Sequence, residues 1–173
     1  MAKYSKEQKE IIEQVKDYLK NMRILKQERL ALQSEYDDIP EPQSPKYSDE
    51  LLGGYSQTKD HQLNKFVYKR KLLLKRIELF DKEIDRFTLK LYLLRNGQRN
   101  IINAYINSHG YNEMIQLLDE RYCISERAYS RSINSICLEL SKYIDYTKIV
   151  KLSDFNDEFN EYIQKYIQNN KID

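Results

Sequence analysis

A group of polar side chains on one predicted helix has the chemistry to contact nucleic acid. The spacing predicts this helix from Ser125 to about Ile144. Arginine can hold a guanine through two hydrogen bonds, asparagine can hold an adenine, and serine can bind a phosphate. Side chains of these types recur every three or four residues, on the face opposite the predicted apolar stripe. They are Arg127, Ser130, Arg131 and Asn134.

The start of this helix has recognisable signals. Ser125 is a suitable N-cap, and Glu126 complements the positive end of the helix. A helix-turn-helix places the first turns of its second helix in the major groove, so we expect these polar side chains at the DNA surface. Glu126 completes the set of candidate DNA-contacting residues. The inward stripe consists of Tyr129, Ile133, Ile136 and Leu140.

Two shorter helices precede this one and would position it. They are predicted over 98–108 and from Tyr111 to about Tyr122, with a break at His109-Gly110 between them. A short turn through Cys123 connects the second of them to Ser125. For Cys123 we expect apolar packing in the turn and not a redox role.

Two long heptad helices are predicted in the first half of the chain. The first runs from Ser5, its N-cap, to Tyr36, and the second from about Asp60 to Leu94. Both seams are apolar except at Arg29 and Arg70. The pattern indicates an antiparallel hairpin, self-association, or both. The seams are Ile11, Val15, Tyr18, Met22, Leu25, Arg29, Leu32 and Tyr36, and Phe66, Arg70, Leu73, Ile77, Phe80, Ile84, Phe87, Leu91 and Leu94.

The second long helix is locally basic. Between residues 59 and 99 there are 12 Lys and Arg against 5 Asp and Glu. Two interpretations stay open, a solvated charged face or a surface that faces phosphates. The cations in its first half are Lys65, Lys69, Lys71, Lys75 and Arg76.

The tail is predicted as a separate helix. Ser153 is expected to cap it, after an extended piece over 146–150. Its aromatic stripe either packs on its own domain or docks RNA polymerase or a second protomer. The stripe consists of Phe155, Phe159, Tyr162, Ile163, Tyr166 and Ile167.

These elements predict an all-α chain in which long heptad helices form a coiled-coil hairpin followed by a helix-turn-helix domain. Residues 1–95 form the hairpin, with a Pro-containing linker over 37–59, residues 96–145 the DNA-binding domain, and residues 146–173 the C-terminal helix. Pro40, Pro42 and Pro45 mark the linker.

Composition disfavours several other classes of protein. Two cysteines without repeated spacing predict no disulfide or metal framework, and the polar N-terminus and lack of a long apolar run predict a cytoplasmic protein without a membrane span. We expect no cofactor and no bound metal at His61 or His109. Carboxylates on one helix are expected to form exposed ion pairs and not an active site, so an enzyme is not expected. They are Glu78, Asp81 and Asp85, with Lys82, Arg86 and Lys90 nearby.

The stretch from Tyr111 to Leu140, with its core ISERAYSRSINSI, resembles the C-terminal domain of phage regulators related to sigma factor region 4. Over residues 5–144 the order of elements resembles late-transcription regulators of phages of low-GC Gram-positive bacteria (the ArpU, RinA and LtrC kind). Two features depart from the pattern. About one extra helical turn follows Leu118 before Ile124, and Ala128 replaces the common Thr.

The resemblance implies a sequence-specific transcription regulator that binds double-stranded DNA and activates phage late genes with host RNA polymerase. It implies DNA contacts by Arg127, Ser130 and Arg131, with Ser125 as cap and Tyr129 in the core. The alternative is a coiled-coil module of a phage or mobile element that binds another regulator without contacting DNA. The net charge of +2 favours this alternative slightly, since many DNA-binding domains are more basic. Either function allows a homo-oligomer.

Overall fold

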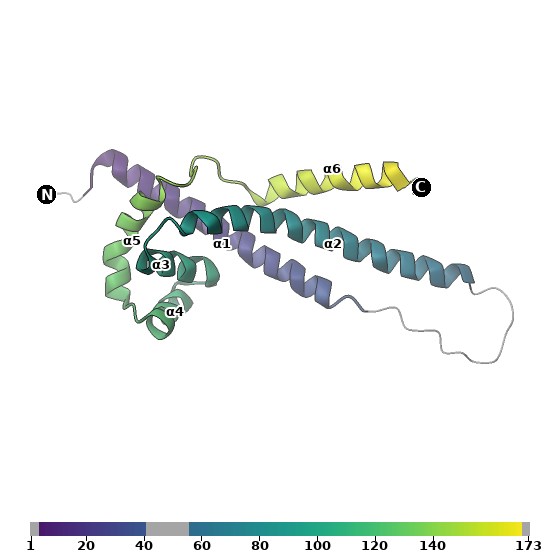
Figure 1. Cartoon of the computed structure of the whole chain (residues 1–173), viewed down its shortest axis with the longest axis horizontal. Helices are drawn as coiled ribbons and strands as arrows, with labels where there is room; N and C mark the ends of the chain where they lie inside the picture. Colours follow the sequence, from purple (N-terminus) through teal and green to yellow (C-terminus); the bar gives the residue numbers. More distant parts are fainter. Residues whose placement is uncertain (1–3, 41–55, 171–173) are drawn as a thin grey trace.

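The computed structural model describes residues 4–40 and 56–170, and within these ranges every regular element is a helix (Figure 1). The predicted all-α class is confirmed. The predicted linker over 37–59 lies mostly outside the described residues, although Asp37 still belongs to the first helix and residues 56–59 already belong to the second, which begins at Ser56 and not at Asp60. The helices are α1 (Lys6–Asp37), α2 (Ser56–Leu91), α3 (Asn96–Asn107), α4 (Tyr111–Tyr122), α5 (Glu126–Leu140) and α6 (Leu152–Asn170).

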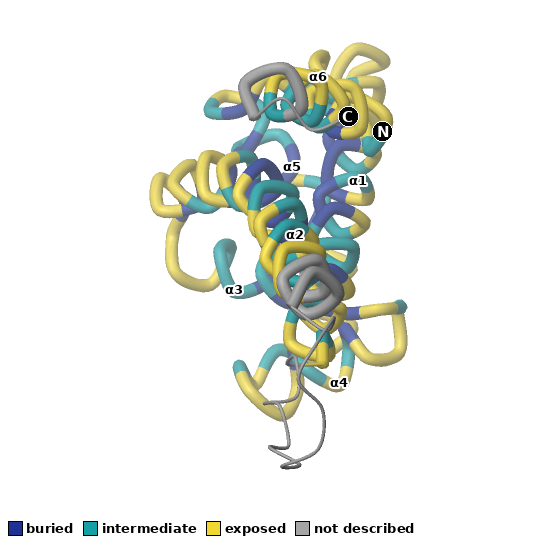
Figure 2. Tube along the Cα trace, turned by 90° about the vertical axis from the view of Figure 1, so that its right-hand side faces the viewer, coloured by how far each residue is buried: buried dark blue, intermediate teal, exposed yellow. Residues whose placement is uncertain are grey.

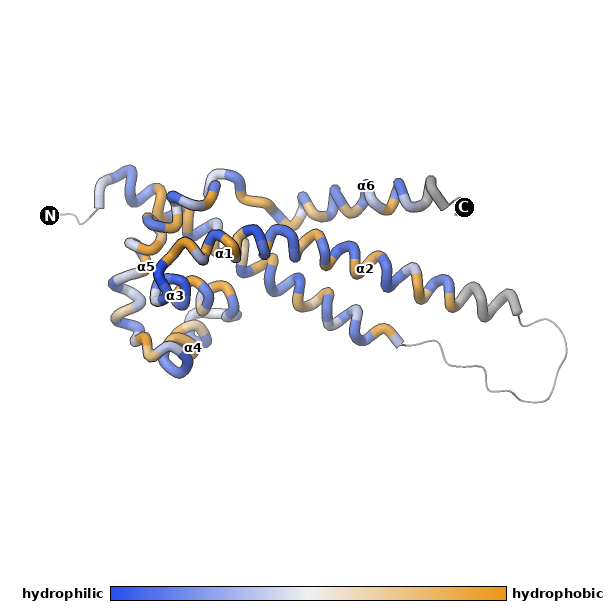
Figure 3. Tube along the Cα trace, in the orientation of Figure 1, coloured by the Kyte–Doolittle hydropathy of each residue, from blue (hydrophilic) through white to orange (hydrophobic). Residues whose placement is uncertain are grey.

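The two long helices pack against each other in opposite directions (Figure 1). Tyr18 in the first half of α1 contacts Phe87 near the end of α2, with ring centroids 5.7 Å apart. Arg70 near the start of α2 instead contacts Tyr36 at the end of α1. Hydrophobic positions recur along both helices (Figure 3), which is the pattern that the spacing of the seams predicts.

The two arginines that interrupt the seams have partners across the pair. Arg29 Nε donates to Asp81 Oδ1 at 2.9 Å, and Arg70 Nη2 donates to the Tyr36 hydroxyl at 2.7 Å. The Arg70 guanidinium also lies 4.4 Å from the centroid of the Tyr36 ring. Each interruption therefore replaces an apolar contact with a polar one between α1 and α2: Arg29 forms an ion pair with Asp81, and Arg70 lies against the hydroxyl and the ring of Tyr36.

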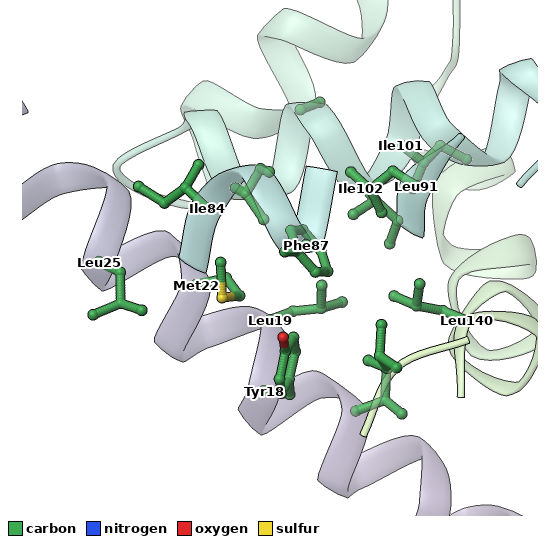
Figure 4. Close-up of a cluster of buried hydrophobic side chains, with 14 of the residues drawn as sticks. Tyr18, Leu19, Met22, Leu25, Ile84, Phe87, Leu91, Ile101, Ile102 and Leu140 are labelled. Carbon is green, nitrogen blue, oxygen red and sulfur yellow. The ribbon is translucent and has the colours of Figure 1, made fainter. Parts of the chain in front are cut away.

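The first half of α1 is buried on two sides. Ile12 and Leu19, which lie outside the predicted seam, are 3% and 1% exposed. They are buried because α1 contacts α3 and α5 as well as α2. Leu19 lies between Phe87 of α2 and Leu140 of α5 (Figure 4). The hydrophobic cluster is thus continuous across the predicted boundary between residues 95 and 96.

Several predicted helix ends differ from the structure. The helix α2 ends at Leu91 and not at Leu94, and Asn96 and Gly97 open α3 instead of stopping α2. The helix α5 ends at Leu140, four residues before the predicted Ile144. After each of these two helices the chain turns, and one apolar residue of the turn is buried. Leu94 and Ile144 are buried without being helical.

The C-terminal helix α6 lies along α2 (Figure 1). Phe155 stacks on Phe80 with ring centroids 4.5 Å apart, and Arg76 donates to Asn156 at 3.0 Å. The aromatic stripe packs on its own chain beyond this first residue as well, since Phe159, Tyr162 and Tyr166 also contact side chains of α2. The predicted cap at Ser153 is wrong, since Leu152 is already helical and the Lys151 N–H donates to the Asp154 carboxylate at 2.8 Å.

Candidate nucleic-acid interface

The helices α4 and α5 are joined by a tight turn that begins at Cys123. This residue has φ 54° and ψ 37°, the left-handed conformation, and its N–H donates to the Asp119 carbonyl at 3.1 Å. The Ile124 N–H donates to the Leu118 carbonyl at 2.9 Å, which satisfies a further carbonyl at the end of α4. The prediction that Cys123 packs in the turn is wrong, because its side chain is exposed. Its backbone forms the turn and its side chain takes no part.

Ser125 caps α5 as predicted. It has extended backbone angles, and its hydroxyl accepts a hydrogen bond from the Ala128 N–H at 3.4 Å. This cap fixes the first residue of the helix at Glu126, so the residues that follow have a defined rotation about the helix axis. The predicted inward stripe is buried as expected, and Cys137 joins it. Its members are Tyr129, Ile133, Ile136, Cys137 and Leu140.

The candidate DNA-contacting side chains lie on the outer face of α5. Arg127, Ser130 and Arg131 are exposed, and so is Glu126, whereas Asn134 is half-buried. Within residues 4–40 and 56–170, neither Arg127 nor Arg131 has a hydrogen-bonding or ion-pair partner. Two arginines four residues apart on one exposed face, both with free guanidinium groups, can bind phosphate or a guanine edge.

The structure adds Tyr111 to this group. Tyr111 is the first residue of α4, and its hydroxyl donates to Glu126 Oε1 at 2.8 Å. The hydrogen bond to this carboxylate raises the pKa of Tyr111. The ring also contacts Tyr129 edge-on, with centroids 6.3 Å apart. No spacing in the sequence indicates this contact, because it depends on how α4 and α5 cross.

The charge around α5 is balanced. From residue 95 to residue 140 the chain carries five arginines and five carboxylates. Arg127 and Arg131 are therefore a local pair of cations and not part of a broad basic surface. Such a pair supplies few phosphate contacts, so it suits recognition at one groove better than non-specific binding along DNA.

The basic first half of α2 is partly neutralised. Lys69 lies 3.5 Å from Glu35 of α1, and Lys75 lies 3.3 Å from Glu78. Arg76 lies against α6, with its guanidinium 5.7 Å from the centroid of the Phe159 ring. Lys65 and Lys71 are exposed and have no ion pair among the described residues.

The carboxylates of α2 do not form the predicted set of pairs on one helix face. Asp81 binds Arg29 of α1, and Arg86 binds Glu83 at 2.8 Å. Lys82 and Lys90 have no ion pair within residues 4–40 and 56–170. Glu78 does form an exposed ion pair within α2, with Lys75, whereas the partner of Asp81 comes from the other long helix.

The described ranges hold no group of three or more His, Cys, Asp or Glu residues placed to bind a metal ion. His109 is exposed, and the His61 side chain lies outside the described part of the structure. No helix within those ranges has the length and apolar character needed to span a membrane.

Comparison of the chain with protein-family models, with curated proteins and with solved structures finds no match. Its function must therefore be argued from the arrangement of α4 and α5.

Proposed function

We propose that this chain is a sequence-specific DNA-binding transcription regulator in which α4 and α5 form a helix-turn-helix. The observation that carries the proposal is the pair Arg127 and Arg131, exposed and unpartnered among the described residues on the first turns of α5. Side chains at this place in a helix-turn-helix reach base edges in the major groove. The resemblance of ISERAYSRSINSI to phage regulators supports activation of phage late genes with host RNA polymerase, in the bacterial cytoplasm.

Each candidate side chain has a distinct role in this proposal. Arg127 and Arg131 read guanine or hold phosphate, and Ser130 binds a phosphate oxygen. Glu126, held by Tyr111, can accept a hydrogen bond from a cytosine amino group. Asn134 lies one turn further along α5 and is half-buried, so it contributes least. The long pair α1 and α2 is proposed as a coiled-coil hairpin that supports α5.

The test is selection of duplexes from a random pool, followed by fluorescence anisotropy with the enriched sequence. Arg127→Ala/Arg131→Ala is expected to weaken binding at least about tenfold, because each arginine contributes to base or phosphate contacts. Wild-type binding is expected to weaken by at least about tenfold between roughly 50 and 200 mM salt.

The matched control is Lys148→Ala/Lys165→Ala. It also removes two positive charges, but at exposed positions outside α4 and α5, so binding should change little. Failure of the folded protein to enrich or bind any duplex at low salt would remove the proposal. If both double variants lose the same amount of affinity, the loss reflects the net charge of the protein. Recognition of DNA by α5 would then be contradicted.

The second candidate function is a protein-binding module that regulates another factor without contacting DNA. The balanced charge of residues 95–140 favours it, because proteins that bind DNA usually concentrate cations at the interface. Under this function Arg127→Ala/Arg131→Ala leaves activity unchanged, and binding to duplexes shows no steep salt dependence.

A further inference from the structure

A cavity opens beside the end of α2, where the segment between α5 and α6 passes the two long helices (Figure 1). Its volume is about 390 Å³, within the range of roughly 300–1,000 Å³ that small-molecule sites usually have. Asn21 of α1 holds the segment in place, because its amide donates a 2.5 Å hydrogen bond to the Val150 carbonyl. The cavity therefore has walls from three parts of the chain. We name it the α1–α2 cavity and describe its lining below.

The helix α2 supplies one wall of the α1–α2 cavity. Glu83, Phe87 and Lys90 line it, and they are three or four residues apart, so they share one face of the helix. The helix α6 leaves these turns uncovered. It packs on α2 through Phe155, which stacks on Phe80, about one turn before Glu83, and from there it runs toward the start of α2.

Much of the lining is apolar. Tyr18 and Phe87 are both buried, and their rings are in contact (Figure 4). Ile144 and Val150 add aliphatic surface from the segment that follows α5. Figure 2, coloured by burial, shows buried residues where α1, α2 and α5 approach one another, so this lining belongs to the common core. The apolar body of a small molecule can be covered here.

The Tyr18 hydroxyl is a polar group that the lining leaves without a partner. The Tyr18 side chain is 7% exposed, and among the described residues nothing forms a hydrogen bond with its hydroxyl. Burial raises the pKa of this phenol to about 12, so it is protonated at neutral pH and can donate. A largely buried donor without an acceptor is costly, and an acceptor on a bound molecule would remove that cost.

The charged side chains around the cavity leave one cation unmatched. Arg86 binds Glu83 at 2.8 Å, and Lys148 lies 3.6 Å from Asp145. Both carboxylates of the lining therefore already have a cation beside them. Lys90 has no ion pair within residues 4–40 and 56–170. The cavity thus combines apolar surface with a free ammonium group and a free hydroxyl donor, which together suit an anion.

We propose that the α1–α2 cavity binds a small organic acid with an apolar body, such as an aryl carboxylate. The carboxylate pairs with Lys90 and accepts a hydrogen bond from the Tyr18 hydroxyl. The apolar body lies against Phe87 and Ile144. A cationic ligand does not fit this lining, because Glu83 already has a partner and so does the second carboxylate. The inference does not depend on DNA binding.

An NMR titration of the isotopically labelled full chain at neutral pH tests the inference with three probes that share one ring. Phenylacetate carries a carboxylate, phenylacetamide is neutral and phenethylamine is a cation. With phenylacetate, the backbone N–H signals of residues at the cavity, such as Ile144 and Val150, are expected to shift and to saturate below about 10 mM. Phenylacetamide should bind at least about tenfold more weakly, because it cannot form an ion pair with Lys90. Phenethylamine should leave these signals unchanged.

Three variants locate the binding energy. Lys90→Met keeps the aliphatic stem but removes the cation, and is expected to weaken phenylacetate binding about tenfold. Lys82→Met is the matched control, since Lys82 is also an exposed lysine of α2 without an ion pair among the described residues but does not line the cavity. Tyr18→Phe removes only the hydroxyl, so a loss of about two- to tenfold is expected. The spectrum of each variant without ligand checks that it is folded.

Three results would overturn the inference. The first is that phenylacetate shifts no signal of the cavity at the highest concentration. The second is that phenethylamine binds as tightly as phenylacetate, which would mean that the ring alone is recognised. The third is that Lys82→Met weakens binding as much as Lys90→Met does, which would mean that the acid responds to the net charge of α2 and not to the cavity.

Discussion

Tyr111, the first residue of α4, donates a 2.8 Å hydrogen bond to Glu126, the first residue of α5. The two positions are 15 residues apart, and the contact joins the starts of the two helices. It holds the Glu126 carboxylate beside the outer face of α5, where Arg127 and Arg131 lie. The Tyr111 phenol thus orients the Glu126 carboxylate on a surface whose other charged groups are the two arginines.

Tyr111→Phe is expected to change DNA recognition and not folding. The ring still contacts Tyr129, but the Glu126 carboxylate loses its donor and gains rotational freedom. We expect weaker discrimination at the base pair that Glu126 contacts, with little change in melting temperature. Anisotropy with duplexes substituted at each position gives the first readout, and thermal unfolding the second. Unchanged discrimination at every position would contradict this role for Tyr111.

Cys123→Gly is expected to stabilise the protein by about 0.5–1 kcal/mol. Cys123 has φ 54°, a conformation that costs a residue with a Cβ but not glycine. Its side chain is exposed, so the substitution removes little packing, and the greater freedom of glycine in the unfolded chain offsets part of the gain. Urea unfolding measures the difference. Cys123→Val should destabilise, since a β-branched residue tolerates this conformation poorly.

The two cysteines are expected to differ in reactivity. Cys123 is exposed, whereas burial raises the pKa of the Cys137 thiol to about 11. Only the thiolate reacts with a disulfide reagent, so at about pH 8 the native protein should show one fast thiol. Cys123→Ser should abolish the fast phase, and denaturant should expose the second thiol. Two fast thiols in the native protein would show that α5 does not bury Cys137.

Leu19→Ala is expected to destabilise the protein by about 2–5 kcal/mol. Leu19 is 1% exposed and lies between α2 and α5, so its truncation leaves a cavity where α1 meets both. The matched control is Ile24→Ala on the same helix, at an exposed position, for which a change within about 0.5 kcal/mol is expected. Denaturant unfolding compares the two. A similar loss in both would mean that α1 is not anchored through Leu19.

Stability is expected to fall between about pH 10 and pH 12. Burial raises the pKa of Tyr18 and of Tyr129 to about 12. In the unfolded chain these phenols ionise near pH 10, so the unfolded state loses protons first. The stabilisation from the raised pKa of these phenols is fully present below about pH 10. It disappears as the pH rises through the pKa of the folded state, and the free energy of unfolding then falls by about 1–2 kcal/mol for each tyrosine. Tyr129→Phe should flatten this slope, and urea unfolding at several pH values measures it.

The local elements of this protein could be predicted from its sequence. Ser5 and Ser125 cap α1 and α5 as predicted, because a cap depends on residues within one turn. The helix α4 has the predicted bounds, and the seam residues of α1 and α2 are largely buried. Exposure of Arg127 and Arg131 also follows from their register against the buried stripe of α5.

Contacts between distant elements were decided only by the tertiary structure. Periodicity shows which face of a helix is apolar, but not which helix covers it or whether a second face is covered as well. Three features depend on contacts between different helices. They are the burial of Leu19, the pairing of Arg29 with Asp81 and the hydrogen bond from Tyr111 to Glu126. Such pairs depend on how whole helices cross, and that is set by the packing of the common core, which no local pattern encodes.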